Sequence, residues 1–211
     1  MKHELVCLEN KWEEINKFLF YTIENNLDNI SIPAQTTKSI TDLFGCDSKC
    51  SAIISYPIGS SEPQVKLHEV MLCTSRNIKK IDYTINIFDL ENFNIRAILS
   101  ELKSAHQICK DKRATLRPIL EYKFLSYQDT ITLINGIASI GIEEMIIGTG
   151  YSVDDYQDNM IISRFIQDKF SINIISSAPI ISQEQYDEAH KNNIFGVRIK
   201  SYKLLDNLCI K

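Results

Sequence analysis

The sequence lacks any long apolar run. No window approaches the roughly 18 consecutive apolar residues that a membrane-spanning helix needs. The first ten residues, MKHELVCLEN, carry acids where a secretory signal peptide has an apolar segment. We therefore expect neither a membrane span nor secretion, and we expect a cytoplasmic protein.

The six cysteines also lack the spacing of a disulfide framework. Cys46 and Cys50, in CDSKC, resemble half of a metal site, but zinc normally needs a second pair of ligands, and the four histidines are dispersed along the chain. Several cysteines lie in apolar runs, where a thiol packs as a small hydrophobic group. We expect free thiols, no structural metal and no other cofactor.

Positive charge is not clustered either. The 23 Lys and Arg residues are spread along a chain of formal net charge -4, which leaves no basic patch for a nucleic acid. Phosphorylated small molecules remain compatible with local cationic sites. We expect a small-molecule ligand, and the sequence leaves both homo- and hetero-oligomers open.

What the sequence does contain is a regular alternation of short β-branched runs with longer stretches of helical spacing. Helical spacing is clear at 11–26, 92–110 and 154–170. Eight strand–helix units favour a closed (β/α)8 TIM barrel over an open sheet, as one compact domain covering 1–211 with a short first strand and a short last helix. The predicted strands are 5–8, 29–32, 51–55, 80–87, 115–122, 144–148, 172–176 and 196–200.

Polar residues that alternate with apolar ones along a barrel strand are expected to point inward, because helices cover the outer face. Unpaired buried charges cost several kcal/mol each, so a charged interior is either an ion-pair network that holds the barrel together or a functional site. The predicted interior positions are Asp82, Thr84, Asn86, Arg117, Ile119, Glu121, Ile146, Gly148, Gly150, Asn173, Ile175, Ser177, Arg198 and Lys200.

Three segments carry a recognisable pattern. YPIGSSEPQVKLHE (56–69) contains a Tyr-Pro-Ile-Gly turn followed by Lys and Glu, IDYTINI (81–87) contains Asp82, and LRPILEY (116–122) contains Glu121. These segments resemble the motifs of deoxyribose-phosphate aldolases, class I aldolases that cleave 2-deoxyribose 5-phosphate to glyceraldehyde 3-phosphate and acetaldehyde. The resemblance places Asp82 at the active-site aspartate of that family and Arg117 at a family lysine.

The family's two active-site lysines have no counterpart. MIIGTGYS (145–152) resembles the family's Val-Lys-Thr-Ser-Thr-Gly-Phe-Ser, with Ile146 at the Schiff-base lysine, and NIISSAPIIS (173–182) resembles Gly-Val-Lys-Ala-Ser-Gly-Gly-Ile-Arg-Thr, with Ile175 at the second lysine. Class I cleavage requires a lysine amine that attacks a carbonyl, and isoleucine has none. The resemblance implies the fold of the family without its imine chemistry.

The family's phosphate-binding backbone is also altered. VRIKSYKL (197–204) resembles the last strand of the family, Arg-Ile-Gly-Thr-Ser-Ser-Gly, but Lys200 stands at a glycine, and Pro179, at another glycine, lacks an amide hydrogen. Lys200, Lys203 and Ser201 remain as a less selective, electrostatic way to bind an anion.

Three hypotheses follow. The first is a pseudoenzyme that binds a sugar phosphate or an aldehyde, or acts as a partner subunit. The second is an enzyme that uses Asp82 or Glu121 as general acid or base without an imine. The third is an aldolase, a lyase, whose amine has moved to Lys200. The expected ligand-binding residues are Arg117, Thr149, Gly150, Ser177, Arg198 and Ser201.

Overall fold

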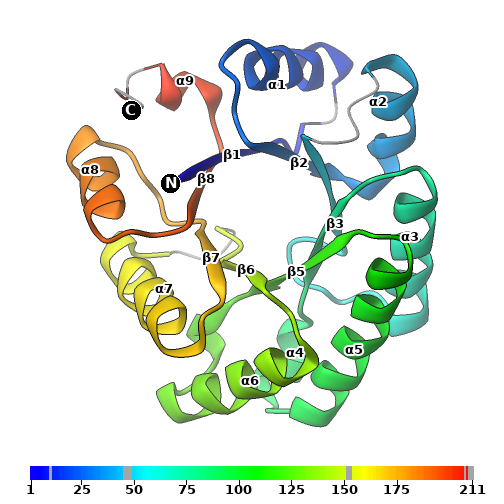
Figure 1. The fold of residues 1–211 in the computed structure, drawn as a ribbon, viewed down its shortest axis with the longest axis vertical. Coiled ribbons are helices and arrows are strands. Elements are labelled where there is room, and N and C mark those ends of the chain that lie inside the picture. Colours follow the sequence, from blue (N-terminus) through cyan, green and yellow to red (C-terminus); the bar gives the residue numbers. More distant parts are fainter. Residues whose placement is uncertain (10, 45–48, 151–153, 207, 209–211) are drawn as a thin grey trace.

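The computed structural model describes residues 1–9, 11–44, 49–150, 154–206 and 208, and Figure 1 shows a ring of strands surrounded by helices. Eight parallel strands pair in chain order and close into a barrel. This confirms the predicted (β/α)8 fold. The strands are β1 (Lys2–Val6), β2 (Asn29–Pro33), β3 (Cys50–Ile54), β4 (Lys80–Thr84), β5 (Thr115–Leu120), β6 (Glu144–Ile147), β7 (Asn173–Ser176) and β8 (Gly196–Ile199).

Helices connect successive strands and cover the outside of the barrel (Figure 1). In α5, Ile98 and Leu102 are buried and Ile95 and Leu99 pack against the core, as their spacing predicts. Among the described residues, no helix is long and apolar enough to cross a lipid bilayer. The helices are α1 (Trp12–Glu24), α2 (Thr37–Phe44), α3 (Pro63–Ser75), α4 (Ile87–Glu91), α5 (Ile95–Asp111), α6 (Tyr127–Ile140), α7 (Tyr156–Phe170), α8 (Gln183–Lys191) and α9 (Tyr202–Leu205), with 3-10 turns at Ala34–Thr36 and Tyr122–Phe124.

Two predicted boundaries are wrong in ways that matter for the interior. The first strand begins at Lys2 instead of residue 5, so it is not abbreviated and it contributes Glu4. The fourth strand ends at Thr84, because the side chain of Asn86 accepts a hydrogen bond from the Phe88 amide at 3.0 Å and caps α4. Asn86 therefore does not share the interior face of Asp82.

Four buried charged side chains form an ion-pair network inside the barrel, and Glu144 lies at its edge, 3.9 Å from Arg117 Nη1. Arg117 Nε donates to Asp82 Oδ1 at 2.7 Å, and Arg117 Nη1 donates to Glu4 Oε1 at 2.6 Å. Arg198 Nη2 donates to Asp82 Oδ2 at 2.6 Å and to Glu4 Oε2 at 3.3 Å. None of the four residues is more than 4% exposed. Two positive and two negative charges cancel, so the low-dielectric interior holds no net charge from them.

Asp82 is saturated with hydrogen-bond donors. Its Oδ2 atom also accepts from Ser31 Oγ at 2.8 Å and from Ser51 Oγ at 2.9 Å. Burial acts to raise the pKa of Asp82, but the charges of Arg117 and Arg198 and the donated hydrogen bonds outweigh it and hold this pKa at about 2. Of the two alternatives for the charged interior, an ion-pair network or a functional site, the geometry of Asp82 fits the ion-pair network.

An apolar layer lies above the charged one, towards the carboxyl ends of the strands. Val6, Ile53, Ile119, Ile146 and Ile175 form a separate buried cluster, and each lies two residues beyond a polar interior residue of its own strand. Ile119, Ile146 and Ile175 are neighbours in register on β5, β6 and β7. We call these five residues the apolar plug. They lie between Asp82 and Arg117 and the mouth of the barrel, whereas Arg198 of the network also lines the cavity at the mouth.

Asp82→Asn is expected to lower the free energy of unfolding by about 3–5 kcal/mol at pH 7, because two buried guanidinium groups lose their shared carboxylate. Urea denaturation measures this loss. Asp168→Asn, which removes an exposed carboxylate 3.4 Å from Arg164, is the matched control and should cost less than about 1 kcal/mol.

The same comparison has a predicted pH dependence. The folded pKa of about 2 lies below the unfolded value of about 3.9, so Asp82 contributes its full stabilisation above pH 4 or so and loses it as the pH falls towards 2. The difference in free energy of unfolding between wild type and Asp82→Asn should therefore become smaller over that interval. A difference that stays constant would contradict the assigned ion pair.

Candidate functional site at the barrel mouth

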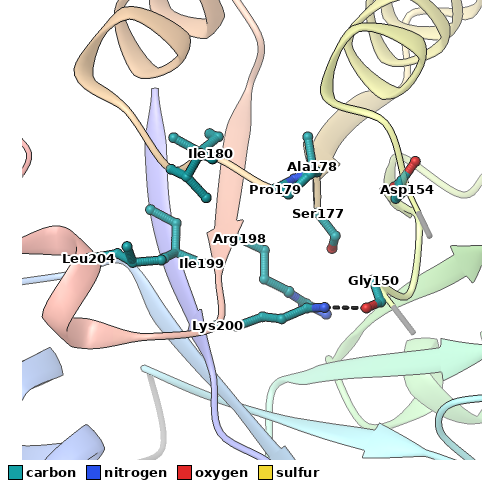
Figure 2. A pocket seen from close by; sticks show the side chains of 11 residues that line it. Gly150, Asp154, Ser177, Ala178, Pro179, Ile180, Arg198, Ile199, Lys200 and Leu204 are labelled. Carbon is teal, nitrogen blue, oxygen red and sulfur yellow. Dashed lines mark hydrogen bonds between the residues drawn. The ribbon is translucent and has the colours of Figure 1, made fainter. Parts of the chain in front are cut away.

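A cavity of about 330 Å³ opens at the carboxyl ends of β6, β7 and β8. Gly150 and Ser177 line it from the segments that follow β6 and β7, and Arg198 and Lys200 line it from the end of β8 (Figure 2). Functional sites of (β/α)8 barrels lie at this face, because its loops vary without disturbing the strands. The cavity is thus the first candidate for a ligand site.

Lys200 reaches across the cavity from the end of β8. Its Nζ atom donates a hydrogen bond to the Gly150 carbonyl oxygen, as the dashed line in Figure 2 marks. Gly150 has a φ of +68°, which favours glycine. A Cβ at this position would displace the flexible end of Lys200. The contact joins two loops that lie 50 residues apart.

The pKa of Lys200 is shifted by its surroundings. Partial burial lowers it, because desolvation disfavours the ammonium form, while the carboxylates of Asp154 and Glu121 act in the opposite direction. The residue as a whole remains exposed to solvent, which keeps the amine accessible from the mouth.

The loop that follows β6 is held by two further side chains. Glu121 accepts hydrogen bonds from the Thr149 amide at 3.2 Å and from Thr149 Oγ1 at 2.7 Å, both on Oε2. The Tyr56 hydroxyl donates to the Thr149 carbonyl oxygen. Glu121 is 2% exposed, and its Oε1 atom has no hydrogen-bond partner within the described part of the chain. In this arrangement Glu121 positions the Thr149-Gly150 turn.

The predicted site residues separate into three groups. Gly150, Ser177, Arg198 and Lys200 line the cavity. Asp82 and Arg117 lie inside the ion-pair network and have no exposed surface. Glu121 and Thr149 hold the loop, and Ser201 is the half-buried N-cap residue of α9 outside the cavity lining.

Sequence reasoning missed Asp154 and the apolar wall of the cavity, which includes Ile180 and Leu204. The carboxylate of Asp154 accepts from Tyr122 Oη at 2.8 Å and from Asn159 Nδ2 at 2.6 Å. The position of Asp154 just after the Thr149-Gly150 turn was the only feature of the sequence that could have indicated a place at the site. The apolar wall is formed by segments that are distant in sequence, and no local sequence pattern predicts such contacts.

Other expectations concern the cysteines and one aromatic residue. Cys7, Cys50, Cys73 and Cys109 are free and buried. Cys46, Cys209 and Tyr151 lie outside the described residues. Because Cys46 is one of them, the metal half-site suggested by Cys46 and Cys50 is not described either. Across the described ranges, no group of three or more His, Cys, Asp or Glu residues is placed to hold a metal ion.

Ile146→Lys, which places an amine in the apolar plug, is expected to lower the free energy of unfolding at pH 7 by about 3 kcal/mol or more, because the new charge enters a buried apolar cluster. Ile146→Met is the matched control and should cost less than about 1.5 kcal/mol. Urea denaturation of both variants measures the difference.

Burial would depress the folded pKa of the new lysine, so the folded state would bind fewer protons than the unfolded state. The deficit of Ile146→Lys should therefore shrink as the pH rises from 7 towards about 10. Equal stability of the two variants at pH 7 would show that the plug accommodates a charge.

Comparison with known proteins relates this fold to one family. No family profile matches the chain. A deoxyribose-phosphate aldolase of Clostridium botulinum (strain Alaska E43 / Type E3) is 24% identical over 149 residues, which span 71% of this chain and 66% of that enzyme. A deoxyribose-phosphate aldolase of Metamycoplasma arthritidis is 25% identical over 173 residues, which span 81% of this chain and 79% of that enzyme.

Solved structures agree with this relation at the level of the fold. The tetrameric deoxyribose phosphate aldolase from Aeropyrum pernix superposes with a TM-score of 0.86 at 16% identity, covering 97% of this chain and 88% of that one. An aldolase called QR15 superposes with a TM-score of 0.83 over 94% of this chain and 90% of its own. The chain is therefore a divergent relative of the deoxyribose-phosphate aldolases.

Proposed function

We propose that this chain binds a small anionic molecule at the mouth of its barrel and does not form a Schiff base at strands β6 and β7. The observation that carries the proposal is the apolar plug. Ile146 and Ile175 have no exposed surface and pack in register, so neither position offers an amine or the space for one. The imine mechanism of class I aldolases needs a lysine amine in contact with the carbonyl carbon.

Lys200 supports the choice of an anion, because it is exposed at the mouth, while the charge of Arg198 is balanced by Asp82 and Glu4. The carboxylate of Asp154 also lines the cavity, where it accepts hydrogen bonds from Tyr122 and Asn159. A guanidinium held in place presents its N–H groups without a further loss of side-chain freedom. The names of the relatives suggest 2-deoxyribose 5-phosphate as the first anion to test.

Incubation with 2-deoxyribose 5-phosphate and borohydride should leave the intact mass of the protein unchanged, because borohydride traps only an imine. The same sugar phosphate, or inorganic phosphate, should raise the thermal midpoint with increasing concentration, since a ligand that binds only the folded state stabilises it. Differential scanning fluorimetry measures the shift. An unchanged midpoint with every anion tested would refute binding at the mouth.

A second candidate, imine chemistry at Lys200, is favoured by one observation. Burial lowers the pKa of this amine where it lines the cavity, which increases the neutral fraction able to attack a carbonyl. Lys200→Ala separates the two candidates. A mass adduct in the wild type that disappears in Lys200→Ala would establish the second candidate and overturn the first.

A further inference from the structure

The two sides of the mouth cavity differ in chemistry. Figure 2 shows Ile180, Ile199 and Leu204 on one side, and the polar ends of Arg198 and Lys200 on the other, together with Ser177 and the carboxylate of Asp154. Ile180 and Ile199 are each 3% exposed, so their side chains form a packed wall whose shape is fixed. A ligand that fills this cavity must satisfy charge at one end and apolar surface at the other.

At the polar end, Arg198 retains an unused donor. Its Nη2 atom is bound to Asp82 and Glu4, while its Nε atom is buried and has no partner among the residues that the structure describes. Unpaired buried donors are rare, because their desolvation is not compensated. Because Arg198 lines the cavity, a small shift of its side chain would let an entering acceptor oxygen reach this donor.

At the apolar end, the wall continues to the rim. Ile181 lies at the edge of the cavity and is 71% exposed, the largest exposed fraction among the large hydrophobic residues described. It follows Ile180 directly, so a tail lying on the wall would also cover this side chain. Apolar surface next to a concave polar group is typical of small-molecule sites.

We infer that the cavity takes a small amphiphilic anion, namely a short-chain carboxylate. The carboxylate lies between Lys200 and Arg198, and the hydrocarbon tail lies along Ile180, Ile199 and Leu204. This inference rests on the proposed function and narrows its ligand from small anions in general to those that carry an apolar tail. A volume of about 330 Å³ is near the lower limit for ligand sites, which restricts the tail to a few carbons.

Isothermal titration calorimetry with acetate, butyrate and hexanoate tests the inference on the full chain. Each methylene that enters the apolar wall should lower Kd roughly fourfold, the ratio expected for one buried CH₂. Hexanoate should also bind more tightly than 2-deoxyribose 5-phosphate, whose hydroxyl groups would be desolvated against isoleucine.

Two variants with matched controls assign the two ends. Ile181→Ser should reduce the chain-length dependence, while Ile161→Ser, at an isoleucine 69% exposed on α7, should leave it unchanged. Lys200→Met should weaken all three acids by a similar factor, roughly fivefold. Lys191→Met, at an exposed lysine at the end of α8, should leave the binding of the acids unchanged.

The outcomes separate the two levels of the proposal. Acids that bind without chain-length dependence, or a sugar phosphate that binds more tightly than hexanoate, would overturn the amphiphilic ligand and leave anion binding in place. If neither the acids nor the sugar phosphate bind, both the amphiphilic ligand and the proposed anion binding are refuted. Chain-length dependence that survives Ile181→Ser but vanishes in Ile161→Ser would place the tail elsewhere and also overturn the inference.

Discussion

The buried ion-pair network is the constraint on which the rest of the structure depends. It joins β1, β4, β5 and β8 through Glu4, Asp82, Arg117 and Arg198, so four strands far apart in sequence meet at one electroneutral point. Removing two charges from water is costly, and the network offsets that cost only because every carboxylate oxygen has a donor. Each change of one partner would leave a charge unmatched.

The network also explains why the mouth is organised as it is. Asp82 and Arg117 are paired and have no exposed surface, so a ligand does not reach them. The groups left for chemistry or binding are Arg198, which lines the cavity, and the residues of the loops above it. At the mouth, Glu121, Tyr56 and Lys200 each bind a backbone group of Thr149 or Gly150, so one short turn is fixed from the segments that follow β3, β5 and β8.

Much of this arrangement follows from the sequence, and the exceptions have physical reasons. Strand periodicity of two placed Asp82, Arg117, Ile146, Ile175 and Arg198 in the interior correctly, because alternation is a local property of the chain. Glu4 was missed because its strand begins earlier than its apolar run. The Lys200–Gly150 contact and the apolar wall depend on approaches between distant loops, which no local pattern encodes.

The packing of Ile146 and Ile175 has an evolutionary consequence. In the plug these side chains belong to one buried apolar cluster and are paired in register, so each makes the other position less favourable for an amine. A single lysine introduced at either position would therefore cost stability before the other position could change. Substitutions in the loops at the mouth do not carry that cost, so the mouth is the part of this barrel that is freer to change.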